Sequence, residues 1–103
     1  MQYTKHAVER LRERFPHHLV PNQHAVVTLN QLFAKAKESK RFFNDTRYMV
    51  YVMDTYGDLN VKFFEYEDMV FLVRRNEVIV TVLSLTDDKL HTSSRFRTSA
   101  TRR

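Results

Sequence analysis

Cysteine and tryptophan are both absent from this sequence of 103 residues. Without cysteine the chain has no disulfides and no thiolate chemistry, as is typical of proteins in a reducing compartment. No apolar run approaches the roughly 20 residues that span a bilayer, and the first residues lack the apolar segment of a signal peptide. Together these absences predict a cytoplasmic protein without a membrane partner.

Glycine and proline are also scarce, at one and two residues. Such a chain has few tight turns and little low-complexity linker. Hydrophobic residues make up 43% of the sequence, with eight Phe and five Tyr, which is enough apolar area for one core. We therefore predict a single domain over residues 1–85, followed by a polar and basic Ser/Thr/Arg-rich tail over residues 86–103.

Positive charge is in excess, with a net charge of +5 and a pI of about 9.7. This balance favours a polyanionic partner such as RNA or DNA. The tail carries Arg95 and Arg97, which are suited to contact a phosphate backbone. Its composition predicts flexibility. The alternative is that the tail only keeps the protein in solution.

Two helices are expected in the first half of the chain. Thr4 can cap the first, and Pro16 ends it. Asn22 can cap the second, which would end among residues 37–41. The apolar residues that recur at helical spacing are Ala7, Val8, Leu11 and Phe15 in the first helix and Val26, Leu29, Phe33 and Ala36 in the second.

From residue 47 the pattern changes to β-branched and aromatic residues without a polar helical face. We expect strands near residues 47–53, 60–66, 69–74 and 77–85. Their short connections exclude parallel crossovers and favour an antiparallel meander. The expected fold is α+β, with both N-terminal helices on one face of a four-stranded antiparallel sheet.

The first helix also carries a polar stripe. His6, Arg10 and Arg14 recur at i, i+4 and i+8, beside the apolar face. An imidazole can transfer protons, and guanidiniums bind phosphate through forked donors, so the stripe suits phosphate chemistry. The alternative is an ordinary surface helix in which Glu9 and Glu13 pair with the arginines.

Other candidates lie on the predicted strands. Thr81 is expected on the same face as Ile79 and Leu83, where its hydroxyl can bind a phosphate oxygen; threonine is also simply a good strand former. Tyr66, at the end of its strand, is a candidate for stacking on an RNA base. The strand-borne Arg74 and Arg75 are candidate RNA-binding residues.

The remaining histidines do not predict a metal site. His17, His18, His24 and His91 match no ligand spacing, and cysteine is absent. We therefore predict no metal and no cofactor.

The order of the expected elements resembles that of the RelE/ParE-like ribonuclease superfamily, which includes barnase-like and colicin-type toxin nucleases. The elements are a His-Ala-Val-Glu-Arg-Leu-Arg-Glu-Arg helix, a second helix and a meander that ends in Val-Ile-Val-Thr-Val-Leu. The opening is similar to small bacterial and phage members with a His-Ala-x-x-Arg first helix. The resemblance covers residues 3–85. It implies that His6 and Arg10 act in catalysis and that Thr81 lies at the phosphate. It also implies RNA, in particular mRNA, as substrate, and an antitoxin or host protein as a further partner.

The leading hypothesis is a small metal-independent endoribonuclease of the toxin or phage RNA-processing type, with His6, Arg10 and Thr81 in one cleft. Two alternatives stay open. One is a non-catalytic protein that binds nucleic acid or inhibits a host enzyme, and the other is a gyrase-directed toxin. The sequence leaves the oligomeric state undecided.

Overall fold

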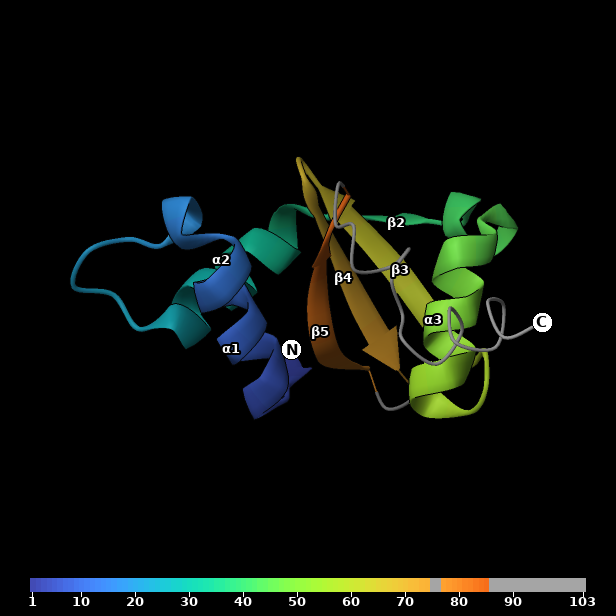
Figure 1. Cartoon of the computed structure of the whole chain (residues 1–103). Coiled ribbons are helices and arrows are strands. Elements are labelled where there is room, and N and C mark those ends of the chain that lie inside the picture. The colour runs from blue at the N-terminus through green and yellow to red at the C-terminus, as the bar shows by residue number, and fades with distance from the viewer. Residues whose placement is uncertain (75–76, 86–103) are drawn as a thin grey trace.

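A mixed five-stranded sheet, in the order β1-β5-β4-β3-β2, organises the computed structural model, which describes residues 1–74 and 77–85. Helices α1 (Lys5–Arg14) and α2 (Ala25–Lys35) lie on one side of the sheet, and α3 (Thr46–Tyr56) lies on the other (Figure 1). The strands are β1 (Gln2–Tyr3), β2 (Lys37–Ser39), β3 (Val61–Tyr66), β4 (Met69–Arg74) and β5 (Val78–Ser84). The predicted α+β class is confirmed.

The first helix forms as predicted. The Thr4 hydroxyl accepts a hydrogen bond from the Ala7 N–H at 3.1 Å, and the helix ends before Pro16. All four residues of the predicted apolar stripe are buried, namely Ala7, Val8, Leu11 and Phe15. The helix is therefore specified locally by its cap and its stop, and it is held by burial of one apolar stripe.

Helix α1 also covers an open sheet edge. Strand β1 pairs with β5 only as far as Ile79, so the rest of β5 has no neighbouring strand on that side. The Thr4 hydroxyl donates to the Val80 carbonyl at 3.1 Å, and the Arg14 guanidinium donates to the Val82 carbonyl at 2.9 Å. These bonds satisfy backbone acceptors that a bare edge would leave exposed.

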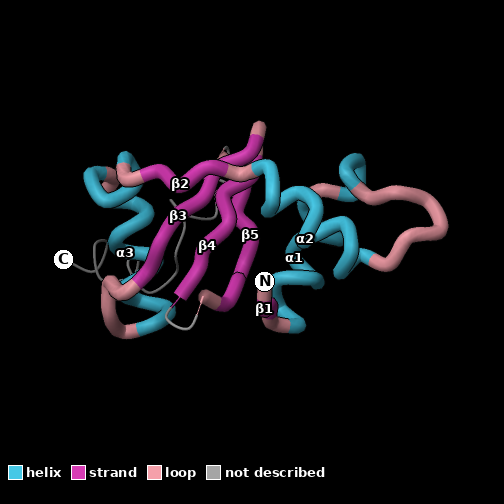
Figure 2. Tube along the Cα trace, turned by 180° about the vertical axis from the view of Figure 1, so that it is seen from behind, coloured by secondary structure: helices cyan, strands magenta, loops and turns pink. Residues whose placement is uncertain are grey.

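The antiparallel meander of β3, β4 and β5 confirms three of the four predicted strands. Glu67 and Asp68 form the two-residue turn between β3 and β4, closed by the Tyr66–Met69 pair. A β-bulge interrupts the pairing of β4 and β5 at Leu72 and Val73. Leu72 pairs with Thr81 and Val73 pairs with Ile79, so β5 has one extra residue at this point. The strands and their neighbours are visible side by side in Figure 2.

The predicted strand over residues 47–53 is wrong, because this segment lies inside α3. The Asp45 carboxylate caps the helix by accepting from the Arg47 N–H, and Gly57 ends it in the left-handed region at φ 81°. Glycine adopts that conformation without a steric penalty. Tyr48 and Val52, one turn apart, are buried on the second face of the sheet. Two caps and an i, i+4 stripe outweigh the strand propensity of the individual residues.

Residues 37–39 form β2 instead of the predicted helix end, and they pair antiparallel with β3. Helix α2 starts at Ala25 with His24 at its N-cap, and Asn22 stands before it in a left-handed conformation at φ 65°. The sheet thus gains β1 and β2 at its two edges. The prediction of a purely antiparallel four-stranded sheet is wrong, since β1 runs parallel to β5.

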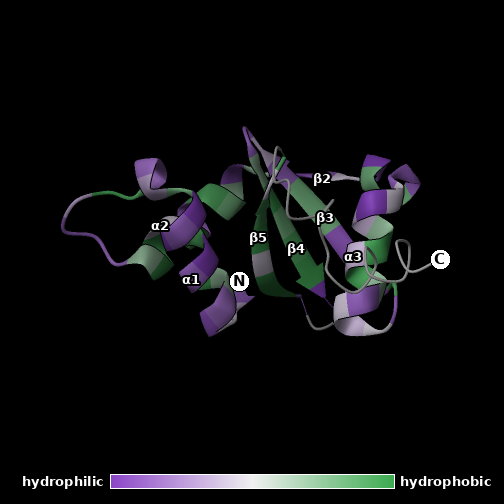
Figure 3. Cartoon of the chain, viewed as in Figure 1, coloured by the Kyte–Doolittle hydropathy of each residue, from purple (hydrophilic) through white to green (hydrophobic). Residues whose placement is uncertain are grey.

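Apolar side chains fill both sides of the sheet, because β4 alternates between two cores. Met69, Phe71 and Val73 face α1 and α2, while Val70 and Leu72 face α3. Figure 3 shows the apolar colouring of the central strands and the mostly hydrophilic colouring of α1. Burial on two faces explains why β4 reads as a nearly continuous apolar run.

Among the described residues, no helix combines the length and apolar character needed to cross a bilayer.

Candidate functional site

The predicted polar stripe on α1 lies at the surface, but its arginines have protein partners. His6 is exposed. Arg10 forms an ion pair with Glu13, and Arg14 donates to the Val82 carbonyl. Partial burial lowers the pKa of His6, and the positive charge of Arg10 lowers it further. His6 and Arg10 thus share one helix flank, whereas Arg14 helps to fasten α1 to β5.

Thr81 does not join them. Its side chain is fully buried (0% exposed), and it pairs with Leu72 of the α3-facing core. Directly paired residues of antiparallel strands share a face, so Thr81 lies on the opposite side of the sheet from Ile79, which faces α1. The bulge shifts the alternation by one residue and overturns the predicted common face. The predicted open cleft of His6, Arg10 and Thr81 is therefore wrong.

The predicted RNA-binding residues are dispersed. Arg74 forms an ion pair with Asp58 at 2.9 Å and lies 4.8 Å from the Tyr56 ring centroid. Burial raises the pKa of the Tyr56 hydroxyl. Arg75, Arg95 and Arg97 lie outside the described residues.

Tyr66 does line a pocket, which sequence reasoning did not assemble. The pocket has a volume of about 420 Å³ and lies between α2, the segment after α1 and the β3–β4 turn. Its lining combines imidazoles, an ammonium, a phenol and a carboxylate with apolar side chains: His17, His18, Leu19, Val20, Pro21, Thr28, Gln31, Leu32, Lys35, Tyr66 and Glu67. The lining thus places polar and charged groups beside an apolar surface, as small-molecule sites commonly do.

Two adjacent imidazoles, those of His17 and His18, line one part of this pocket. They belong to η1 (Pro16–His18), a single 3-10 turn that follows α1. The ring centroids of His17 and His18 are 4.4 Å apart. The His17 side chain is 58% exposed and the His18 side chain 15% exposed. One imidazole is thus open to solvent, while the other is partly enclosed.

Carboxylates from the β3–β4 turn face both rings. The Nε2 atom of His18 lies 3.4 Å from Oδ1 of Asp68 and 3.7 Å from Oε1 of Glu67. The Nε2 atom of His17 lies 3.7 Å from Oδ2 of the same Asp68. Residues separated by about half the chain therefore meet in one cluster, which we call the His–Asp cluster (His17, His18 and Asp68).

Both halves of the His–Asp cluster are anchored to the core. Phe15, which is buried, lies within 6.0 and 6.2 Å of the His17 and His18 ring centroids. The Asp68 carbonyl accepts a hydrogen bond from the Leu85 N–H at 3.0 Å, which ties the turn to the end of β5. One ring contact and one backbone hydrogen bond thus hold the two turns in place before any ligand binds.

Lys35 supplies the positive charge of the pocket. Its Nζ atom lies 5.8 Å from the centroid of the Tyr66 ring, and it comes from the last turn of α2. The Tyr66 ring in turn lies 6.5 Å from the His18 ring. The site therefore combines two imidazoles with one cation and one aromatic surface.

Sequence spacing missed the His–Asp cluster because its third member lies fifty residues downstream of the histidines. The signal that was present was the placement of adjacent histidines after a helix stop and of adjacent acids at a hairpin turn. Only the packing of α1 against the sheet brings these two ends together.

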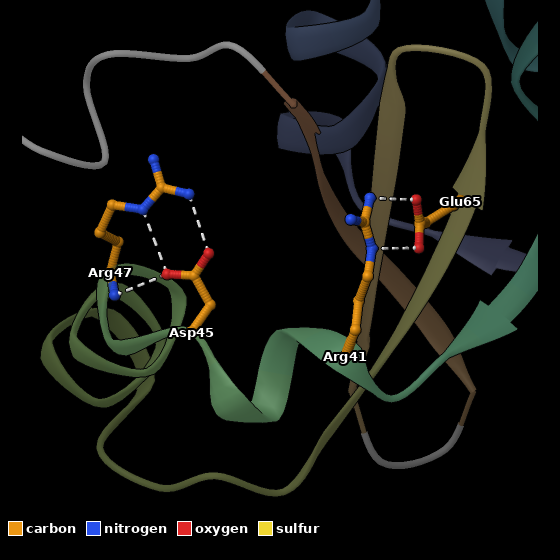
Figure 4. Close-up of polar contacts among 4 residues, drawn as sticks. All are labelled: Arg41, Asp45, Arg47 and Glu65. Carbon is orange, nitrogen blue, oxygen red and sulfur yellow. Dashed lines mark hydrogen bonds and ion pairs between the residues drawn. The ribbon is translucent and has the colours of Figure 1, made fainter.

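Two forked ion pairs neutralise charge elsewhere among the described residues. Arg41 binds Glu65 through two hydrogen bonds of 2.9 and 2.7 Å, and Arg47 binds Asp45 through bonds of 3.1 and 2.8 Å (Figure 4). The guanidinium hydrogen bonds lower the pKa values of Glu65 and Asp45. These forked pairs position η2 (Arg41–Asn44) and the start of α3, so their cations are already engaged.

Comparison of the chain with protein family models, curated proteins and solved structures found no match. The resemblance to RelE/ParE-like ribonucleases therefore stays a prediction.

Proposed function

We propose that this protein is a small metal-independent endoribonuclease whose proton-transfer groups are His17 and His18. The observation that carries the proposal is the presence of two imidazoles, Lys35 and Tyr66 around one open pocket. RNA cleavage by its own 2′-hydroxyl needs a base, an acid and a cation near the phosphate. The pocket offers each of these groups, whereas the α1 flank offers one imidazole.

In this proposal His18 is the base. When its Nε2–H donates to Asp68, its Nδ1 atom keeps the free lone pair and can take the proton of the 2′-hydroxyl. The 2′-oxygen then attacks phosphorus, and the bond from phosphorus to the 5′-oxygen breaks. His17, the more exposed imidazole, gives its proton to the departing 5′-oxygen. The products are a 2′,3′-cyclic phosphate and a 5′-hydroxyl.

Lys35 and Tyr66 hold the substrate in this scheme. The ammonium offsets charge that develops on the phosphorane, and the phenol ring offers a face on which a base can stack. Glu67 and Asp68 oppose the approach of phosphate, so the pocket alone is a weak anion site. Attraction at long range must come from elsewhere on the chain.

The tail is the source of that attraction in the proposal. The described residues hold eleven of the seventeen Lys and Arg residues and ten of the twelve Asp and Glu residues, and are thus nearly neutral. Most of the net charge of +5 therefore belongs to residue 75 and residues 86–103. We propose that the tail attracts RNA and that cleavage takes place at the pocket of His17 and His18.

The test is incubation of the pure chain with total RNA in the presence of a metal chelator. The expected result is discrete cleavage, with fragments that end in cyclic or 3′-phosphates. Intact RNA after prolonged incubation with folded protein would contradict the proposal. An activity abolished by chelator would contradict the metal-independent chemistry.

A non-catalytic binding protein is the second candidate. The observation that favours it is the near neutrality of the described residues, since a protein partner does not require a basic surface. In that case folded protein would leave RNA intact in chelator and in the presence of divalent cations alike. An inhibitor of a host enzyme would then be retained on its target in a pull-down, and the His17 and His18 substitutions would not release it.

A further inference from the structure

We infer that the His–Asp cluster is a binding site for a late first-row divalent cation, with Zn²⁺ as its best fit. Each of His17, His18 and Asp68 offers one donor atom, and these atoms all lie within 4.8 Å of one another. Two of them come from one 3-10 turn and the third from a hairpin turn that packs beside it.

The donor atoms lie close to the spacing of tetrahedral coordination, with one atom from each of the three residues within 4.8 Å of the others. Bonds of about 2.0–2.1 Å to nitrogen and oxygen imply ligand–ligand separations of about 3.4 Å in a tetrahedron. The separation from His18 Nε2 to Asp68 Oδ1 is 3.4 Å, and that from His17 Nε2 to Asp68 Oδ2 is 3.7 Å. These two distances end on different oxygens of Asp68, so we infer that side-chain rotation brings the three donors in around one ion.

The shell has room for a fourth ligand. The Glu67 carboxylate approaches His18 Nε2 to 3.7 Å, and it is 58% exposed, so it can enter the shell or leave the position to water. Two imidazoles with one or two carboxylates suit Zn²⁺, whereas Mg²⁺ prefers six oxygen ligands. The anchoring of the two turns by Phe15 and Leu85 supports a preformed site.

Metal binding and RNA cleavage would exclude each other. A bound ion takes the Nε2 lone pairs of both imidazoles, so the proton of His18 moves from Nε2 to Nδ1, and Nδ1 can no longer accept the proton of the 2′-hydroxyl. The ion-bound His17 is held neutral and cannot act as the acid. Zn²⁺ should therefore inhibit cleavage. The expected inhibition of cleavage rests on the proposed function, but binding of the ion does not.

The experiment is titration of the full chain with Zn²⁺ by calorimetry, with Mg²⁺ in parallel. We expect one Zn²⁺ per chain and no heat from Mg²⁺. Co²⁺ should give the visible absorption of a tetrahedral complex at the same stoichiometry. The His18→Ala and Asp68→Asn substitutions each change a direct ligand. Loss of an outer-shell partner typically weakens metal binding by about 10–100-fold, so each of these substitutions should weaken Zn²⁺ binding by more than that.

The matched controls are His24→Ala and His6→Ala. His24 is exposed at the N-cap of α2 and makes no side-chain capping bond, and His6 lies on α1 outside the cluster. Both variants should bind Zn²⁺ as the parent does. Asp68→Asn keeps the backbone carbonyl that Leu85 contacts, and an unchanged melting temperature would show that it still folds.

Unchanged affinity in His18→Ala and Asp68→Asn would overturn the inference, as would equal losses in the two controls, because both outcomes indicate adventitious binding to surface histidines. If Zn²⁺ binds as expected but cleavage proceeds at the same rate, the metal site stands and the assignment of His17 and His18 to catalysis is wrong. If Zn²⁺ does not bind while RNA is cleaved, the metal inference fails alone.

Discussion

The two histidine regions of this protein differ in what surrounds them. His6 lies on the flank of α1 with Arg10 one turn away, and partial burial and, after it, this cation disfavour its charged form. His17 and His18, at the opposite end of α1, face the carboxylates of Glu67 and Asp68 at 3.4–3.7 Å. One helix thus carries an isolated imidazole near its first turn and a pair of imidazoles just beyond its last.

The difference shows what a helical stripe can and cannot provide. Spacing along α1 places His6 and Arg10 on one flank, but it brings no second proton-transfer group, because Thr81 lies behind the sheet. The other end of α1 abuts a hairpin turn, so it gathers groups from distant parts of the sequence. Chemistry that needs several groups is better served where elements meet than along the face of one element.

The largest expected effect separates these two regions directly. If the chain cleaves RNA, His17→Ala and His18→Ala should each lower the rate by about 10²–10⁴, because each removes a proton-transfer group. His6→Ala should retain the parent rate. The measurement is the initial rate on one defined RNA, with His24→Ala as control and the melting temperature of each variant as a check of folding. A loss confined to His6→Ala would restore the site predicted from the α1 stripe.

A second effect concerns the affinity for RNA, which the tail would supply whichever of the two histidine regions carries out cleavage. Deletion of residues 92–103 removes Arg95, Arg97, Arg102 and Arg103. For single-stranded RNA, the slope of log affinity against log salt should flatten by about 0.7 for each arginine that contacts a phosphate. Affinities measured from 50 to 200 mM salt would give this slope. If the truncated chain keeps the parent slope, the Lys and Arg residues that contact phosphate lie before residue 92, and the deleted segment does not attract RNA.

Thr81 gives a smaller effect, on stability. Among the described residues its buried hydroxyl has no hydrogen-bond partner. Thr81→Val keeps the shape and removes the unsatisfied group, so it should stabilise the fold by about 1 kcal/mol or more. Chemical denaturation measures this change, and the cleavage rate should stay at the parent value. A folded Thr81→Val variant with impaired cleavage would instead return Thr81 to the site.

The smallest effect is a pH dependence of stability that comes from His6. Its pKa in the folded chain is below the ordinary value of 6.5, so between these two values the unfolded chain binds the proton more readily. Stability should therefore fall as the pH drops through 6.5 towards the folded-state value, and it should show no contribution from His6 well above 6.5. His6→Gln should reduce this slope in melting temperatures recorded from pH 5 to 8. A slope that is the same in both proteins would mean that His6 is solvated like a free imidazole.

Several elements could be predicted from the sequence because their signals are local. Thr4, Pro16 and the stripe from Ala7 to Phe15 define α1, and the two-residue Glu67–Asp68 turn defines the β3–β4 hairpin. Segment 47–53 was predicted as a strand because Val and Tyr favour strands. The caps at Asp45 and Gly57 were also local signals of a helix, and they are the ones that agree with the structure.

The candidate site follows a different logic. The sequence by itself determined the α+β class, the α1 stripe with His6 and Arg10, and the position of the excess charge, because composition and short-range periodicity encode each of these. Only the tertiary structure decided that β1 and β2 complete the sheet, that a bulge turns Thr81 away from α1, and that Asp68 reaches His17 and His18. These outcomes depend on register and on contacts between residues far apart in the chain, which short-range patterns do not specify.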